Sequence, residues 1–157
     1  MDSEKQNLVY AGFWARTGAT LIDIILIIFI TFPLLYGIYG PNYFASEKFI
    51  QGFWDILISW ILPAIATFLF WKYRCATPGK MVIKARILDA KTGQTPSNSQ
   101  LIIRYFAYLI PMLPLFLGFL WIAWDKKKQG WHDKIASTVV VRDHKQGPDQ
   151  VVFETKK

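Results

Sequence analysis

Long apolar stretches separated by short polar segments dominate the pattern of this chain. Between residues 18 and 40 the only charged residue is Asp23. Twenty-odd apolar residues, each rising about 1.5 Å along a helix, cross the hydrocarbon core of a bilayer, which is about 30 Å thick. A soluble core helix is apolar on one face only, whereas this stretch is apolar on all sides. The pattern therefore predicts a transmembrane helix over residues 17–38.

A second apolar stretch, residues 53–71, carries tryptophans at or near its ends, where interfacial anchors occur. We predict a second transmembrane helix there. The segment 72–100 holds six basic residues and one acidic residue, and the tail 125–157 holds eight basic residues. By the positive-inside rule, segment 72–100 and the N-terminus are cytoplasmic, and the weakly charged loop 40–52 lies outside.

The third apolar stretch, residues 100–124, is interrupted by prolines at positions 111 and 114. Ser97 and Gln100 have the spacing of a capping box, which predicts a helix from residue 100 to about residue 110. A kinked full span is one alternative, but it would put the basic tail outside. We favour an in-plane helix followed by a re-entrant or hairpin segment.

Two short segments in the basic regions favour β-strands. Residues 81–88 (MVIKARIL) and 137–141 (STVVV) are rich in β-branched residues. A single strand is not stable alone, so we predict that these two pair on the cytoplasmic side. Residues 77–80, with Pro followed by Gly, are predicted to form a turn. The predicted fold class is an all-α membrane protein: a small transmembrane bundle of two spans and a Pro-bent third segment, with a short cytoplasmic β pair.

The charged residues of the first span are costly to bury and are therefore functional candidates. A charge at the centre of a span costs about 2.5–3.5 kcal/mol on insertion scales. Arg16 lies seven residues before Asp23, on the same helix face but about 10 Å away along the axis, so we expect no direct contact. Arg16 is expected to reach lipid head groups if it faces them, and Asp23 needs another partner, water or a proton. A packing face with a hydrogen-bonded or neutral acid is the alternative to a functional one.

Composition narrows the classes of function. Apolar residues make up 53% of the chain and charged residues 18%, whereas soluble domains carry about 25% charged residues. The single cysteine, Cys75, excludes an internal disulfide and a cysteine-based zinc cluster. In a membrane protein, a net charge of +7 reports the orientation of the protein in the bilayer and its attraction to anionic lipid head groups. We therefore expect lipid and no nucleic acid as a partner. No nucleophile elbow, glycine-rich phosphate loop or metal-ligand spacing occurs, and we expect no catalysis and no cofactor.

His132 and Asp133 follow a basic run at residues 126–128. Imidazole titrates near neutrality, so these residues are candidates for proton transfer. Neighbouring residues on a helix do not face each other, so an internal His–Asp pair is not expected. We expect Asp133 to cap or dock the turn before the second strand, or to meet Arg16.

The order of these motifs resembles the RDD family of bacterial membrane proteins, which is named for one arginine and two aspartates. The resemblance runs from about residue 13 to residue 141 and is carried by Arg16 and Asp23, residues 77–80, Arg104, and residues 129–134 with the strand after them. It implies a polar N-terminus (1–9), a membrane domain (10–141) and a polar tail (142–157), in a multi-pass protein of the bacterial plasma membrane.

The resemblance also implies which residues give the family its name. Arg16 matches the arginine and Asp23 the first aspartate. The second aspartate is Asp133, with Asp125 as the alternative. Arg104 and His132 are secondary candidates.

Two functions remain open. A scaffold or accessory module, in which the Arg/Asp set holds the helices and tail together, suits the small size of the chain. The alternative is an ion or proton transporter, since antiport has been proposed for some family members, with Asp23 as the protonatable or cation-binding site. Two spans make too few walls for a pore, so the transporter would be a homo-oligomer or pair with other membrane subunits. We favour the first.

Overall fold

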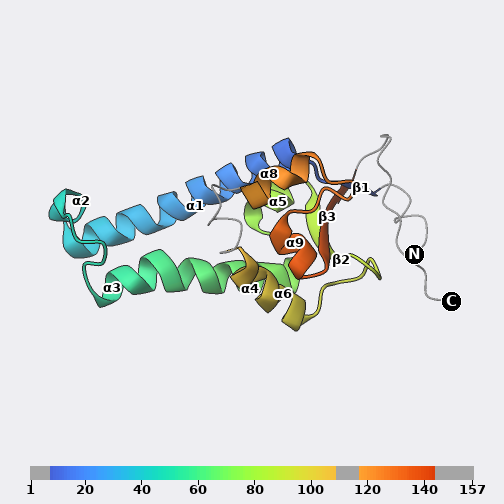
Figure 1. The fold of residues 1–157 in the computed structure, drawn as a ribbon. Helices are drawn as coiled ribbons and strands as arrows, with labels where there is room; N and C mark the ends of the chain where they lie inside the picture. The colour runs from blue at the N-terminus through green and yellow to red at the C-terminus, as the bar shows by residue number, and fades with distance from the viewer. Residues whose placement is uncertain (1–7, 109–116, 144–157) are drawn as a thin grey trace.

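The computed structural model describes residues 8–108 and 117–143. Two long helices lie side by side, joined at one end by a short loop, and a small sheet with short helices covers their other end (Figure 1). We call this covering unit the cap. It consists of the β-sheet and three short helices, α5 (Pro78–Val82), α6 (Asn98–Ala107) and α9 (Trp131–Ile135).

The first predicted span is a single helix, α1 (Phe13–Tyr39). It begins four residues before the predicted start at 17 and continues through Pro33. The second span is continuous and consists of α3 (Phe53–Ile56), the π-helical turn η2 (Leu57–Ile61) and α4 (Leu62–Arg74). Both helices are long and apolar enough to cross a membrane, as predicted.

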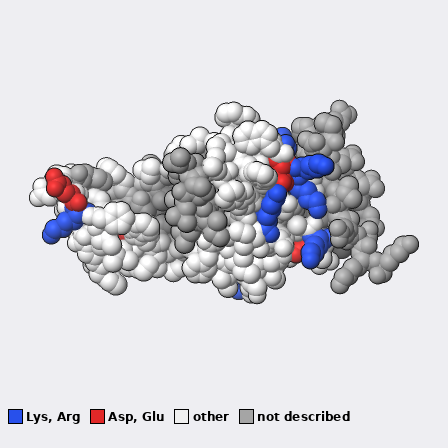
Figure 2. All heavy atoms as spheres, in the orientation of Figure 1, with Lys and Arg blue, Asp and Glu red and all other residues white. Residues whose placement is uncertain are grey.

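The surface of the two long helices is apolar and open. Phe29 on α1 is 79% exposed and Ile65 on α4 is 55% exposed. Figure 2 shows most charged atoms gathered towards the two ends of the visible face, and the described surface between them is mainly uncharged. We call the exposed apolar surface of the two long helices the apolar belt; such a surface is typical of one that contacts lipid or a partner.

The π-helical turn η2 has a local cause in the sequence. The N–H of Leu62 donates to the carbonyl oxygen of Leu57, five residues earlier. Pro63 follows immediately, and a proline has no N–H with which to continue the regular ladder. The proline thus changes the hydrogen-bond register in the middle of the second span.

The loop end of the molecule is closed around Asp55, which is 3% exposed. Its carboxylate accepts hydrogen bonds from the hydroxyls of Tyr43 (2.6 Å) and Ser59 (2.9 Å), and from the backbone N–H of Gln51 (2.9 Å). The short helix α2 (Asn42–Ala45) contributes Tyr43. Asp55 therefore fixes the connection between the two spans.

The sheet has three antiparallel strands in the order β1-β3-β2: β1 (Leu8–Tyr10), β2 (Ala85–Asp89) and β3 (Thr138–Asp143). The pairing of β2 with β3 confirms the predicted pairing, and Ile87 lies opposite Val140. The third strand corrects the prediction, because Leu8 and Val9 belong to it and not to a polar N-terminus. Both side chains are buried, and β3 supplies the edge that they need.

The segment after the second span differs from the prediction. Residues 77–80 do not form a simple turn and residues 81–82 do not belong to a strand, because α5 begins at Pro78 and ends at Val82. Proline suits the first position of a helix, since its fixed φ is already helical and its missing N–H is not needed there. The strand β2 begins only after Lys84, whose φ is 54°.

The helix α6 begins with the predicted capping box. The Ser97 hydroxyl accepts from the N–H of Gln100 (3.3 Å), and the Gln100 side chain accepts from the N–H of Ser97 (2.9 Å). The proline bend at 111–114 lies outside the described residues. The stretch resumes as α8 (Leu117–Leu120) and η3 (Trp121–Ala123), and α8 contacts α9. Both described ends of the stretch therefore lie at the cap, and the re-entrant or hairpin segment between them stays a prediction.

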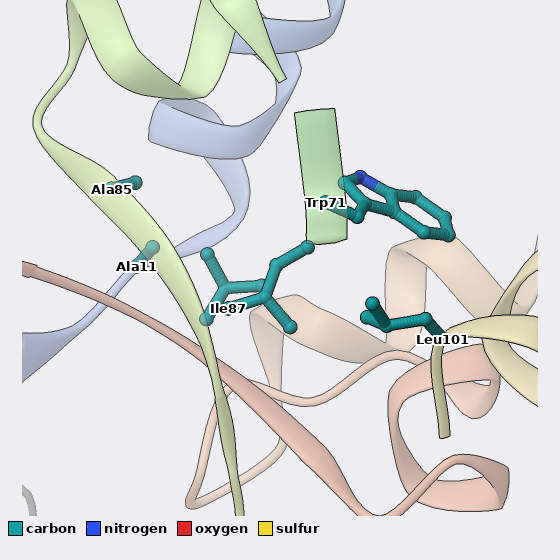
Figure 3. Close-up of a cluster of buried hydrophobic side chains, with 6 residues drawn as sticks. Ala11, Trp71, Ala85, Ile87 and Leu101 are labelled. Carbon is teal, nitrogen blue, oxygen red and sulfur yellow. The ribbon is translucent and has the colours of Figure 1, made fainter. Parts of the chain in front are cut away.

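The core of the cap joins the sheet to the second span. Figure 3 shows Trp71 of α4 beside Ile87 of β2 and Leu101 of α6. The small side chains of Ala11 and Ala85 complete this layer. The end of α4 is thus embedded in the cap.

Candidate functional site

Asp133 lies at the centre of a buried cluster of charges. Its Oδ2 pairs with Arg16 Nη1 from α1, and its Oδ1 pairs with Arg104 Nη1 from α6. The backbone N–H of Gly130 also donates to Oδ2, at 2.9 Å. All three charged side chains are buried. One carboxylate on α9 therefore connects a span, a cap helix and its own helix start.

Each arginine makes a second connection. Arg16 Nε donates to the carbonyl oxygen of Ala11 at 3.0 Å, and Arg104 Nη1 donates to the hydroxyl of Thr138 at 2.6 Å. The expectation that Arg16 reaches lipid head groups is wrong, because the fold brings α9 to the start of α1. Asp133 both caps its own helix and meets Arg16, so both contacts expected for it occur.

Mutual stabilisation keeps the cluster ionised. Burial alone would raise the pKa of the Asp133 carboxyl, but the guanidinium groups of Arg104 and Arg16 hold this pKa well below its usual range. Burial would likewise lower the pKa of Arg104, but the charge of Asp133 raises it. Removing one partner would leave a buried charge uncompensated, at a cost of about 3–5 kcal/mol.

His132 is a neutral packing group beside this cluster. Its ring stacks on Tyr108, with centroids 4.1 Å apart and an interplanar angle of 20°. Burial lowers the pKa of His132 from 6.5 to about 3, against the opposing charge of Asp133. Its Nε2 lies 3.5 Å from Asp133 Oδ1, and its Nδ1 has no hydrogen-bond partner. The two side chains touch, but the imidazole is uncharged at neutral pH, so they form no ion pair.

Asp23 joins the first span to the start of α5. Its Oδ2 accepts from the Thr77 hydroxyl at 2.5 Å, and its Oδ1 accepts from the backbone N–H of Gly79 at 2.6 Å. Asp23 therefore contacts the predicted 77–80 motif and not Arg16, consistent with the expected separation along α1.

Gly79 is required for this approach. A Cβ built at Gly79 would lie 2.0 Å from the carbonyl oxygen of Ala19 and 3.0 Å from Cγ of Asp23. Real Cβ atoms do not approach backbone that closely. The small pair of Ala19 and Gly79 thus lets α5 lie directly on α1, within reach of the Asp23 carboxylate.

Asp125 lies in a different environment from Asp133. Its Oδ1 pairs with Lys134 Nζ at 2.5 Å, and its Oδ2 accepts from the backbone N–H groups of Lys127 (3.1 Å) and Gln129 (3.0 Å). Burial would raise its pKa, but the hydrogen bond from Lys134 lowers it. Asp125 orders a turn before α9 and pairs with no arginine among the described residues.

Sequence reasoning missed Lys80 as a candidate. Its side chain is 7% exposed, and its ammonium group lies 5.8 Å from the ring centre of Trp71. Lys80 and Asp23 both line a cavity of about 560 Å³ between the two spans. Lys80 follows Pro78 and Gly79 directly, so it lies close to α1. In the sequence alone, it is only one of the six positive charges of segment 72–100.

The candidate residues therefore fall into three places. Arg16, Arg104, Asp133 and His132 form one buried cluster, Asp23 lies at the cavity, and Asp125 lies near the surface. Within the described ranges, no group of three or more His, Cys, Asp or Glu side chains is arranged to hold a metal ion.

Comparison with known proteins identifies the family. The model of the RDD family matches residues 10–137, which is most of the chain. The chain belongs to the RDD family. The resemblance seen in the motifs is thereby confirmed, and the apolar helices of this RDD protein are those of a membrane protein.

Several bacterial proteins are similar to this RDD protein. An uncharacterized protein of Rickettsia prowazekii is 29% identical over 88% of this chain and 99% of its own length. The uncharacterized membrane protein YteJ of Bacillus subtilis is 27% identical over 90% of this chain and 87% of its own length. The proline-rich antigen homolog of Mycobacterium tuberculosis is 33% identical over 54% of this chain and 38% of its own length. No solved structure matches the chain significantly.

Proposed function

We propose that this RDD protein is a membrane scaffold or accessory module, and that its Arg/Asp set fastens the cap to the two spans. One observation carries the proposal: the carboxylate of Asp133 joins Arg16 at the start of α1 to Arg104 on α6. Asp23 makes a second fastening, from α1 to Thr77 and Gly79. Both aspartates that match the family name bridge elements distant in the sequence.

The carboxylates of Asp133 and Asp23 already have partners, which supports a structural role rather than a role in a catalytic or transport cycle. A group that turns over must change its proton or its partner during a cycle. Asp133 is fully buried between two guanidinium groups, and both oxygens of Asp23 already accept hydrogen bonds. The module would accordingly not be an enzyme, and its partners would be a second copy or other membrane subunits that cover the apolar belt.

The orientation belongs to the same proposal. The cap and the N-terminus face the cytoplasm of a bacterium, and the loop around Asp55 faces outward. The support is the concentration of basic residues in segments 72–100 and 125–157.

A second candidate function has a specific observation in its favour. Asp23 lines the cavity between the spans, together with Lys80. In an oligomeric ion or proton transporter, this carboxylate would be the site that gains and loses the proton or cation. An oligomer would be needed because two spans alone enclose no pore.

Variants of Asp23 and Gly79 separate the two candidates. Asp23→Asn keeps an acceptor for the Gly79 N–H and a donor for the Thr77 hydroxyl oxygen, but it removes the titratable charge. Asp23→Ala removes both contacts, and Gly79→Ala forces α5 away from α1 while leaving the carboxylate in place. For a scaffold, Asp23→Asn should stay near the parent, and the other two variants should lose stability by about 1–3 kcal/mol, the penalty for unpaired buried groups.

Two measurements decide the outcome. Thermal unfolding of the purified protein reports the stability of each variant, and a pH-sensitive or ion-sensitive dye in liposomes reports flux. Measurable flux in the parent that disappears in a normally folded Asp23→Asn would favour the transporter. Parent-like stability in both Asp23→Ala and Gly79→Ala would contradict the fastening role.

A further inference from the structure

The cavity between the spans has the shape of an acyl-chain groove. It measures about 560 Å³ and is lined mainly by apolar side chains of α1 and α4. On α1 its lining runs from Thr20 to Thr31. This run of eleven steps at 1.5 Å each is about 16 Å long, close to half of the 30 Å hydrocarbon core. The groove therefore matches the depth of one leaflet.

Hydrogen-bond donors gather at the cap end of this groove. Lys80, Trp71 and Tyr108 all line it there. The indole Nε1 of Trp71 is buried and has no hydrogen-bond partner. Lys80 is also more than nine-tenths buried, and no carboxylate among the described residues forms an ion pair with it. A buried ammonium group that has an aromatic neighbour but no carboxylate partner indicates a missing anion.

The surrounding charges favour an anionic acceptor. Within the described part of the chain, three buried cations lie at this end of the spans, Arg16, Arg104 and Lys80, and the carboxylates of Asp133 and Asp23 lie close to them. Asp23 borders the groove, but its two oxygens already accept from Thr77 and Gly79. His132 is neutral, so it does not change the balance. Lys80 is the one of these three buried cations that has no carboxylate partner among the described residues.

We propose that this groove binds one anionic phospholipid of the leaflet on the cap side. The phosphate accepts from Lys80, and one acyl chain lies along the groove between α1 and α4. A free phosphate ion would satisfy the donors but would leave the apolar length of the groove empty, so the membrane lipid is the source. The inference holds whether the Asp23 contact is structural or transporting.

Lipid titration of the full-length protein tests the charge recognition. The protein is purified in detergent, stripped of lipid, and titrated separately with phosphatidylglycerol and phosphatidylcholine, with bound lipid counted by native mass spectrometry. We expect one phosphatidylglycerol per chain, bound at least tenfold more tightly than phosphatidylcholine. Lys80→Gln should lower phosphatidylglycerol affinity about tenfold and leave phosphatidylcholine unchanged. Lys72→Gln, which removes an exposed lysine in the last turn of α4, is the matched control and should have no effect.

A second pair of variants tests the groove itself. Ala66→Phe fills it, whereas Ala64→Phe adds the same bulk on another face of α4, in an apolar crevice that has no polar lining. Ala66→Phe should abolish tight lipid binding, and Ala64→Phe should not. Equal binding of the two lipids, parent-like affinity in Lys80→Gln, or unchanged binding in Ala66→Phe would each overturn the proposal.

Photo-crosslinking identifies the occupant directly. A photoreactive phenylalanine analogue at Ile27, which lines the groove, should form an adduct with phosphatidylglycerol in vesicles. A crosslink to a second copy of the chain, or to residues 109–116 of the same chain in place of lipid, would show that protein fills the groove and would overturn the proposal.

Discussion

At the scale of single residues, the cluster around Asp133 sets the protonation of its neighbours. One carboxylate faces two guanidinium groups, and a neutral imidazole, stacked on Tyr108, lies beside them. His132 stays neutral because burial disfavours its charged form and because Arg104 and Arg16 would repel a third positive charge. The stability of the cap is therefore linked to pH through this one side chain.

His132 should make the protein less stable as the pH falls from 7 to 5. In the unfolded chain the imidazole binds a proton below its usual pKa of 6.5, whereas the folded protein resists protonation down to a pKa of about 3. Between these values the unfolded state binds more protons, so acid favours unfolding. The linkage amounts to about 2 kcal/mol between pH 7 and pH 5. Thermal unfolding in detergent at the two pH values measures it.

His132→Phe is the control, since it keeps a flat ring over Tyr108 and removes the titration. Its unfolding temperature should change little between pH 7 and pH 5. The Asp133 carboxyl does not contribute in this range, because its pKa lies well below it. An equal acid-induced loss in the parent and in the variant would assign the pH dependence to another group.

What the sequence predicts about these residues depends on how local the contact is. The Ser97–Gln100 capping box lies within three residues, and it forms as predicted. The seven-residue separation of Arg16 and Asp23 correctly indicates that they do not meet. The burial of Lys80 could not be read from the sequence, because it depends on α5 lying against α1.

At the scale of elements, distant segments are joined by charge rather than by apolar packing alone. The cap docks on α1 through Arg16 and Asp133 and, separately, through Asp23 and Gly79. The strand predicted over residues 81–88 begins only at residue 85, because a short run of β-branched residues fits a helical turn as well as a strand. Pro78 favours the helix, because it occupies the first position of α5.

Double-mutant cycles should show which pair couples. Arg16→Gln and Asp133→Asn remove partners of one ion pair, so their effects on stability should be less than additive, with an interaction energy of about 0.5–3 kcal/mol. Arg16→Gln and Asp23→Asn act on separate contacts about 10 Å apart along α1, and their effects should add within about 0.5 kcal/mol.

Thermal or chemical unfolding of the parent, the three single variants and the two double variants provides both cycles from one set of proteins. The Arg16/Asp23 cycle serves as the internal control for the Arg16/Asp133 cycle. Strong coupling between Arg16 and Asp23, with additivity for Arg16 and Asp133, would mean that the first span is stabilised by an internal contact and not by α9.

At the scale of the whole molecule, the hydrophobic pattern and the charge balance predict most of the architecture. The two spans and the pairing of the strands at 85–89 and 138–143 follow from local periodicity and from the need of a strand for a partner. The third strand and the groove cannot be predicted from the hydrophobic pattern or the charge balance. The short segment at residues 8–10 has no pattern of its own, and a groove is the space left between helices whose crossing no local signal specifies.

The last prediction concerns the side of the membrane on which the cap lies. Because β2 pairs with β3, the loop after β2 and the residue before β3 must lie on one side together. Single cysteines at Glu47, Thr95 and Ser137, in a Cys75→Ser background, report each side through an impermeant thiol reagent. In intact cells only position 47 should react under the proposed orientation, in which the basic cap faces inward. Permeabilised cells should label positions 95 and 137 equally. Labelling at 137 without labelling at 95 would separate the two strands and contradict the sheet, whereas labelling at both but not at 47 would keep the sheet and invert the proposed orientation.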